Sequence, residues 1–360
     1  MSRSNQVRSL INHFVGFNVI QSESSIQTQF VYLWFFWFNT VRLASIWWCY
    51  DDVTCERTLG EFYRGFFEPR VFYRVVYLIV SAIPTAILTI SSCQRIMKPI
   101  LVEKFCKMIS SIDVESASLN KPLKLINIFI FSGTTCAAIF LPAMLFILWL
   151  KLKVEITFMY ILMSALIVNH ARMIFNSLSA LYLLLYIVQD KFSAWSKRLI
   201  PQISNPYENI TNILNDYNRH HIELVIANSI LKNYVGIYAL LALPLNCLLV
   251  VLLRNLVLNA IFAIIGYLLF VSSFLTFMYI VACTSSHFGT VHKSIRTRLL
   301  RVNDSSKMKL KLLNIIGKPA NLLGISIFGL HTVTKLTFLK ITLLTIRYTM
   351  LCYKQTSSYN

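Results

Sequence analysis

Three cations recur at a fixed interval near the carboxyl end of the chain. Lys340 stands just before the largely apolar stretch ITLLTIRYTMLCYKQTSSYN, and Arg347 and Lys354 lie inside it, seven residues apart. Because seven residues at about 100° each nearly complete two helical turns, the three side chains share one face of a helix. Such a face either lines a water-filled pathway or places its cations at the membrane interfaces.

These two interpretations predict different behaviour. Rings of positive charge along a pore would oppose cation flow, and would favour anions or close the pathway. In the other interpretation Lys340 and Lys354 reach the inner and outer interfaces, while Arg347 pairs with a polar neighbour. The choice depends on the elements that surround this helix.

The composition predicts an all-α, polytopic membrane protein. Of 360 residues, 56% are hydrophobic and only 14% are charged, and the mean hydropathy is +0.61. Several apolar runs reach the length of roughly 20 residues that crosses a bilayer core of about 30 Å. The short alternating segments of a membrane β-barrel do not recur. We therefore expect one seven-helix domain over 1–360, with spans at approximately 27–49, 71–93, 125–150, 156–188, 234–253, 256–283 and 322–352.

Two of these segments predict particular shapes. The fourth, 156–188, is longer than one crossing needs at about 1.5 Å per residue, so it either tilts or projects into the cytosol. The fifth and sixth segments are separated by little more than Arg254 and Asn255, which predicts a tight helical hairpin.

The distribution of cations predicts the orientation. With the amino terminus inside, the inner connections hold about three times as many Lys and Arg residues as the outer ones. Seven spans then place the amino terminus in the cytosol and the carboxyl terminus outside the cell. The net charge of +19 is explained by attraction to anionic membrane lipids, so we expect no nucleic-acid partner. The sequons at Asn209 and Asn303 fall in inner loops and should carry no glycan.

Catalytic and metal-binding patterns are absent from the sequence. It has no glycine-rich phosphate loop and no nucleophile elbow, and its few acidic residues show no catalytic pairing, so we expect neither an enzyme nor a cofactor. Adjacent histidines on a helix point about 100° apart, which is poor metal geometry. We expect solvated cytosolic positions instead for His220, His221, His287 and His292.

Other side chains leave two interpretations open. Cys49 and Cys55 form either a disulfide or two unpaired thiols. Aromatic side chains in the outward halves of the helices suit a small organic ligand, and they equally suit helix packing and interface belts. The candidate ligand-pocket residues are Tyr77, Trp149, Tyr160 and Tyr267.

The whole layout resembles the insect chemoreceptor superfamily of gustatory and odorant receptors. A cytosolic amino terminus is the reverse of a G-protein-coupled receptor, and the Asp/Glu-Arg-Tyr and Asn-Pro-x-x-Tyr motifs of that class are missing. The lead-in LINHFVGFNVIQ, the extended fourth helix running into VQDKFSAWSKRLI, and the basic connection to the last helix are similar to those of gustatory receptors. The connection includes a Gly-x-x-x-Phe-x-Leu stretch at Gly324, Phe328 and Leu330.

The terminal signature of that family is present in altered form. Family members carry Thr-Tyr, five hydrophobic residues and Gln-Phe, whereas this chain has Arg347-Tyr348, then TMLCYK, then Gln355-Thr356. The chain therefore resembles a divergent gustatory receptor or a gustatory receptor-like protein. The resemblance adds Tyr348 and Gln355 to Lys340, Arg347 and Lys354 as candidate pore-lining residues.

The resemblance implies a multi-pass cell-membrane receptor for a small-molecule tastant or odorant. Members of the family are usually tetrameric, ligand-gated, non-selective cation channels whose last helices line the pore. A homo- or hetero-tetramer embedded in membrane lipids is therefore expected. The alternative is a non-conducting relative or a modulatory subunit, which the altered signature favours, and a G-protein-coupled receptor is a more distant third.

Overall fold

The computed structural model describes residues 99–110, 158–204, 210–255, 260–301 and 323–357, with scattered positions between 34 and 139. The expected spans at 27–49, 71–93 and 125–150 lie outside the described residues, apart from those scattered positions. The described part is almost entirely helical, as the sequence predicts.

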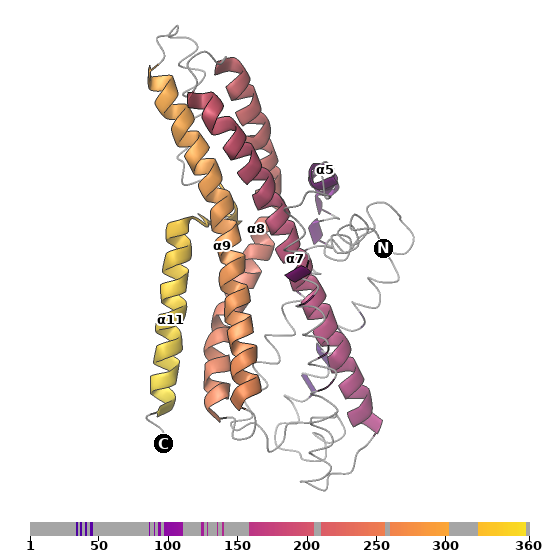
Figure 1. Ribbon diagram of the computed structural model, residues 1–360. Helices are drawn as coiled ribbons and strands as arrows, with labels where there is room; N and C mark the ends of the chain where they lie inside the picture. Colours follow the sequence, from indigo (N-terminus) through magenta and orange to yellow (C-terminus); the bar gives the residue numbers. More distant parts are fainter. Residues whose placement is uncertain are drawn as a thin grey trace.

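Three long helices form the body of the molecule (Figure 1). They are α7 at Phe158–Ser204, α8 at Ile210–Asn255 and α9 at Ala260–Arg301, with 47, 46 and 42 residues. At about 1.5 Å per residue each is roughly twice as long as a bilayer core is thick. The continuous helix α7 runs well past residue 188, as the long fourth segment predicted. Helices α8 and α9 pack against each other, as expected of a hairpin. Their bounds differ from the expected spans 234–253 and 256–283, because α8 begins at Ile210 and α9 continues to Arg301 through more polar sequence.

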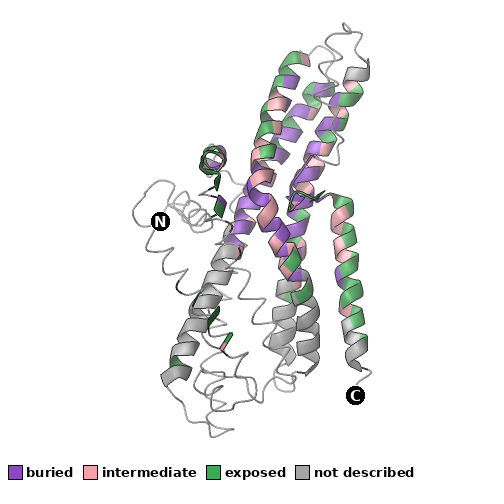
Figure 2. Cartoon of the chain, turned by 180° about the vertical axis from the view of Figure 1, so that it is seen from behind, coloured by how far each residue is buried: buried purple, intermediate pink, exposed green. Residues whose placement is uncertain are grey.

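The described side chains of the long helices form a buried core (Figure 2). The largest fully buried ones come from four helices, and they are Tyr217, Phe105, Phe192, Phe274, Phe288, Leu181 and Leu183. Aromatic rings interlock there, with the Phe192 and Phe288 centroids 4.6 Å apart in an edge-to-face arrangement. This core includes residues that the sequence places at and beyond the cytosolic ends of the spans.

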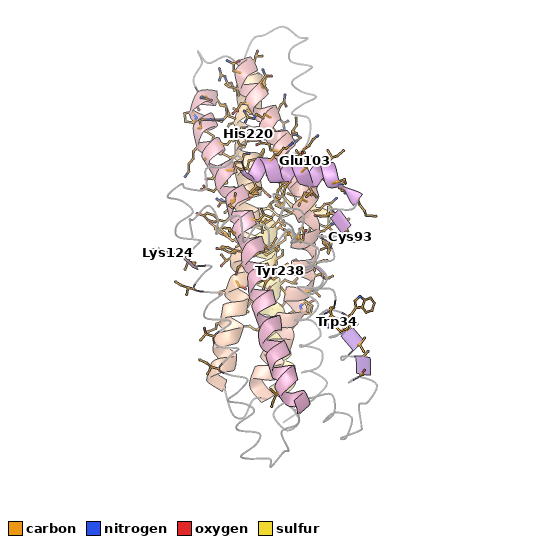
Figure 3. All side chains as sticks on the ribbon, turned by 90° about the vertical axis from the view of Figure 1, so that its right-hand side faces the viewer. Trp34, Cys93, Glu103, Lys124, His220 and Tyr238 are labelled. Carbon is orange, nitrogen blue, oxygen red and sulfur yellow. The ribbon has the colours of Figure 1, made fainter. Side chains whose placement is uncertain are left out.

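A short amphipathic helix covers the side of the bundle. Helix α5, Pro99–Ser110, lies across the long helices (Figure 3) and packs on α8. It buries Phe105, Met108 and Ile109 while Glu103 and Lys107 remain exposed. Just before α5, the side-chain amide of Gln94 donates a hydrogen bond of 2.9 Å to the carbonyl of Ile230.

The last helix begins later than the expected span 322–352. Residues Ser326–Ile327 (β1) and His331–Thr332 (β2) form a small antiparallel hairpin, and α11 occupies Lys335–Ser357. Gly324, Phe328 and Gly329 have positive φ angles of 155°, 52° and 80°, which a helix excludes. Thr334 then caps the new helix, because its hydroxyl accepts a hydrogen bond from the Thr337 amide at 3.2 Å.

Two stretches in the described part of the chain are long and apolar enough to cross a membrane. They are Ile210–Ala242 and Val271–Arg298, and each buries about half of its most apolar window, 44% and 56%. The count of seven spans and the sidedness of the termini remain predictions.

Candidate functional site: the outer face of the last helix

Among the described helices, α11 packs against α8 and α9, and it does so through one face. Thr345 is buried on this face, and Phe338 and Ile341 are partly buried against the core. The Phe338 ring meets the Tyr279 ring of α9 edge to face at 5.6 Å. The Thr342 and Thr345 hydroxyls donate to carbonyls of the preceding turn, which satisfies them inside the helix.

The three cations lie on the opposite face. Lys340, Arg347 and Lys354 are all exposed, and at about 100° per residue they lie about 180° from the centre of the packing face. Within the described part of the chain, neither Lys340 nor Arg347 has a hydrogen-bond or ion-pair partner. A polar neighbour for Arg347, which the interface interpretation requires, is therefore not found among the described residues.

The other candidates are placed less completely. Tyr348 is exposed and lies on the flank of α11, between the packing face and the cations. Gln355 belongs to α11, and Tyr160 and Tyr267 belong to α7 and α9, but their side chains are not described. Tyr77 and Trp149 lie outside the described residues, so the expected ligand pocket remains a prediction. Cys49 and Cys55 also lie outside them.

The hairpin before α11 forms a joint with α8 that the sequence did not predict. The Ser326 amide and hydroxyl both donate to Oδ1 of Asn228, at 2.8 and 2.9 Å. The Phe328 amide donates to the Lys232 carbonyl at 3.1 Å. Since Asn228, Lys232 and Gly236 are spaced by four residues, they present one face of α8 to the hairpin. The Gly-x-x-x-Phe-x-Leu stretch was the signal that marked this region.

The hairpin is also close to α9. A Cβ at Gly324 would lie only 2.0 Å from the Ser285 hydroxyl oxygen. Gly324 is therefore needed both for its positive φ and for this close approach. The start of α11 is fixed against two of the long helices.

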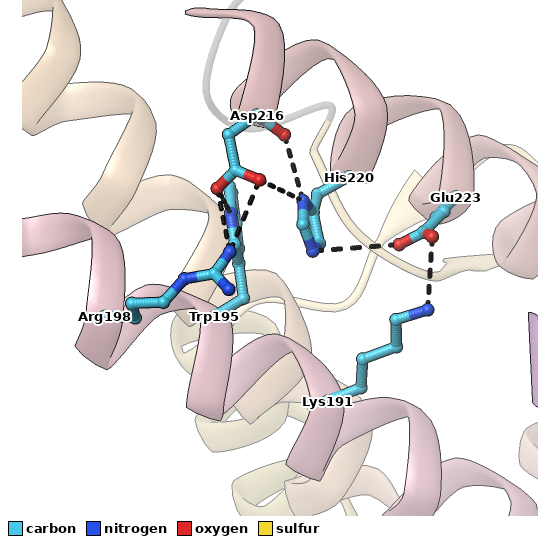
Figure 4. A network of polar contacts seen from close by, with 6 residues as sticks. All are labelled: Lys191, Trp195, Arg198, Asp216, His220 and Glu223. Carbon is cyan, nitrogen blue, oxygen red and sulfur yellow. Dashed lines mark hydrogen bonds and ion pairs between the residues drawn. The ribbon is translucent and has the colours of Figure 1, made fainter. Parts of the chain in front are cut away.

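A polar network ties α7 to α8 at the edge of the described core (Figure 4). The Trp195 indole donates to Oδ2 of Asp216 at 3.0 Å, and Nη2 of Arg198 reaches both carboxylate oxygens at 3.3 and 3.1 Å. The Lys191 ammonium lies 3.2 Å from Oε1 of Glu223. These charge-assisted contacts fix the relative position of the two helices.

The expectation that all four histidines are solvated is wrong for two of them. His220 is 7% exposed and His292 is 3% exposed. His220 stacks on Trp195 at 4.8 Å with Nδ1 placed 2.9 Å from the Asp216 carbonyl, and Nδ1 of His292 lies 2.9 Å from the Tyr217 hydroxyl. The polar neighbours of these two histidines in the sequence suggested exposure to solvent, but packing against residues of other turns and helices buries both side chains. In the described residues, no group of His, Cys, Asp or Glu could hold a metal ion.

The long helices α7, α8 and α9, with α11 packed on α8 and α9, form a helical architecture that solved structures share. The chain is similar to the insect olfactory receptor OR5 from Machilis hrabei in complex with eugenol, with a TM-score of 0.62 and 10% identity, covering 97% of each chain. A second structure of that receptor matches with a TM-score of 0.56 and 10% identity over 97% of this chain and 96% of that one. At this identity the likeness shows a shared fold.

The sequence itself gives no corresponding match. No family model matches it, and no curated protein matches it.

Proposed function

We propose that this protein is a gustatory-type chemosensory receptor that detects a small molecule in the cell membrane. The observation that carries the proposal is a fold shared over 97% of the chain with an olfactory receptor whose structure holds eugenol. The gustatory subtype is supported by the lead-in LINHFVGFNVIQ, which is similar to that of gustatory receptors, and by the altered terminal signature around Tyr348 and Gln355.

In this proposal the protein is a subunit of a ligand-gated ion channel, assembled as a homo- or hetero-tetramer. A small molecule binds among the outward halves of the helices, for which Tyr77, Trp149, Tyr160 and Tyr267 are candidates. Binding shifts the last helices and opens a central pathway. The proposed pore residues are Lys340, Arg347, Tyr348, Lys354 and Gln355. The exposure of the cationic face and its position opposite the packing face support this assignment.

A non-conducting relative or modulatory subunit is the second candidate. It is favoured by Arg347 and Lys354, which stand where the family has threonine and, at the strict spacing, glutamine. Cations at these two positions would repel the ions that a cation channel conducts.

Three measurements test the proposal. Tags at the two termini should be labelled on intact cells only at the carboxyl end, and amino-terminal labelling would favour a G-protein-coupled receptor. The chain expressed alone should give currents to some member of a panel of tastants and odorants that begins with eugenol. If the chain gives no current when expressed alone, and gives currents only when a second receptor is co-expressed, the modulatory subunit is favoured.

The third measurement concerns the pore residues. Arg347→Thr with Lys354→Gln should change conduction or ion selectivity, and unchanged currents would show that α11 does not line the pore.

A further inference from the structure

One carboxylate oxygen in the network between α7 and α8 is buried without a hydrogen bond (Figure 4). Oε1 of Glu223 lies 3.2 Å from the Lys191 ammonium, whereas Oε2 has no hydrogen-bond partner within the described part of the chain. Nε2 of His220 lies 3.9 Å from Oε2, which is too far for a hydrogen bond. A buried acceptor in this state costs free energy, so the contact between His220 and Glu223 requires a physical explanation.

The other side of the His220 ring determines which nitrogen carries the hydrogen. Nδ1 lies 2.9 Å from the Asp216 carbonyl oxygen, and a carbonyl oxygen only accepts, so the hydrogen is on Nδ1. In the uncharged ring Nε2 therefore carries a lone pair. This lone pair and Oε2 of Glu223 are two acceptors with no donor between them. One proton at Nε2 would turn their contact into a charge-assisted hydrogen bond.

The charged groups around the ring already balance one another. On α8, Asp216 is paired with Arg198 of α7. Glu223 is paired with Lys191, also of α7, and these two side chains are only 16 and 18% exposed. Because His220 is buried, a proton on its ring would add a positive charge to a neutral, partly desolvated cluster. The ring is therefore uncharged at neutral pH and takes up the proton in acid.

Helix α9 adds another titratable pair to the same core. Nδ1 of His292 lies 2.9 Å from the hydroxyl of Tyr217, on α8. An experiment on His220 must therefore distinguish its proton from one on His292. The sequence places His220 between the expected spans 156–188 and 234–253, in a connection on the cytosolic side, so the proton would come from the cytosol.

We propose that His220 and Glu223 form a proton-binding site that weakens the tie between α7 and α8 in acid. A proton from water binds Nε2 of His220, and the new N–H donates to Oε2 of Glu223. The carboxylate is then shared between the imidazolium and Lys191, two cations that repel each other. The Trp195 ring is stacked on His220 at 4.8 Å and 13°, and the face of an indole attracts a cation. The site goes beyond the proposed function and does not require it.

The burial of the ring determines the sign of the pH dependence. An exposed histidine is half protonated near about pH 6.5. In the folded chain the same proton enters a buried cluster whose charges already cancel, so folding opposes its uptake. The unfolded chain therefore binds more protons on acidification, and the stability of the fold decreases as the pH falls below about 6.5.

The first arm of the experiment detects the proton through Trp195. A protonated imidazole quenches the fluorescence of a stacked indole more strongly than an uncharged one does. In the full chain, purified in detergent, the Trp195 emission is the difference between the parent chain and Trp195→Phe. This emission should decrease on acidification, with one midpoint below about pH 6.5.

Two histidine variants assign this titration. His220→Gln should abolish the decrease in Trp195 emission, because no imidazole then contacts the indole. His221→Gln changes the next residue of the same helix and should keep the decrease. An emission that does not respond to pH, or a decrease that survives His220→Gln, would overturn the proposal.

The second arm tests Glu223 and Lys191 as the groups that favour and oppose the proton. Glu223→Gln should lower the midpoint and Lys191→Gln should raise it, each by about one pH unit. Both variants keep His220, so they test the site even if His220→Gln does not fold. Shifts in the same direction, or no shift in either variant, would show that Glu223 does not share the proton.

The third arm measures the weakening of the fold. Between about pH 7.5 and about pH 5.5, the melting temperature of the parent should fall by at least about 2 °C more than that of His220→Gln. His221→Gln should behave like the parent. An equal fall in the parent and in His220→Gln would overturn the weakening of the α7–α8 tie. No arm needs a ligand or a current, so a negative result here would leave the proposed function standing.

Discussion

The ring of Phe328 lies directly over Gly236, and a Cβ added to that glycine would come within 2.6 Å of Cγ of the ring. Phe328 adopts a positive φ of 52° to reach this position, and its amide donates to the Lys232 carbonyl one turn earlier on α8. A non-glycine residue in this conformation costs roughly 1–2 kcal/mol, so the contacts with α8 must hold it there. The contact couples the long helix α8 to the segment that begins α11.

Gly236→Ala should destabilise the protein by about 1–3 kcal/mol, because the new methyl group forces the ring out of its place. Phe328→Ala in the Gly236→Ala background should recover much of this loss, since the clash disappears with the ring. Thermal unfolding of the full chain in detergent measures both effects. The control is Gly289→Ala in α9, where nothing lies within 4 Å, and it should be neutral or slightly stabilising. Equal behaviour of the two glycine variants would show that the ring does not constrain α8.

Asn228→Ala should loosen the hairpin by about 1–3 kcal/mol, because it leaves the Ser326 amide without its acceptor. Ser326 is buried, and both its amide and its hydroxyl donate to Asn228. Asn228→Asp keeps an acceptor in the same place and should lose less stability. Hydrogen exchange at Ser326 should accelerate in Asn228→Ala and change little in Asn228→Asp. The reverse order would contradict the hydrogen bond.

Asp216→Ala should lower the free energy of unfolding by about 1–3 kcal/mol, since it removes the acceptor of Trp195 and of Arg198. The indole would lose its polar partner, so a shift of tryptophan fluorescence should accompany the loss. The exposed pair of Glu103 and Lys107 offers a comparison, because Glu103→Gln removes a surface ion pair of little energetic value. Unequal melting temperatures of the two variants are expected, with Asp216→Ala lower.

Tyr217 and His292 should show a positive coupling energy in a double-mutant cycle. Their side chains meet in the core at 2.9 Å, across α8 and α9. Tyr217→Phe removes the hydroxyl and leaves a buried ring nitrogen without this partner, and His292→Leu removes the other side of the pair. The double variant should be less destabilised than the sum of the single ones, by about 0.5–1.5 kcal/mol. Strict additivity in urea unfolding would argue against the bond.

The apolar parts of the long helices were readable from the sequence, since their signal is continuous, whereas the extension of α8 back to Ile210 and of α9 on to Arg301 was not predicted. The apolar run after residue 156 continues into polar residues with no helix-breaking cluster before Ser204, and α7 is unbroken over that range. Arg254 and Asn255 interrupt the next long apolar run, and α8 ends at Asn255. Such helices can be predicted because the hydropathy of neighbouring residues is enough to identify an apolar helical segment.

The hairpin and the buried histidines could not be read in the same way. The stretch GISIFGL is apolar enough to extend the last helix, and only the backbone angles of Gly324, Phe328 and Gly329 show that it turns. His220 lies in a polar sequence and is nevertheless buried by Trp195 of α7. Both depend on contacts between residues about 20 to 100 positions apart, which a local pattern does not contain. The seven-residue spacing of the cations was visible in the sequence, but the sequence did not show which face of α11 packs against α8 and α9.

The buried core of the described helices has a consequence for how far the sequence can vary within this fold. Apolar residues of similar volume replace one another in a core at a cost below about 1.5 kcal/mol, so the bundle constrains size and polarity more than identity. Two chains can differ at nine residues in ten and keep one backbone arrangement, as the 10% identity with the olfactory receptor structure illustrates. A sequence that forms the same hairpin against α8 and α9 should therefore keep glycine at the positions of Gly236 and Gly324, where a Cβ would clash, even if its other residues differ.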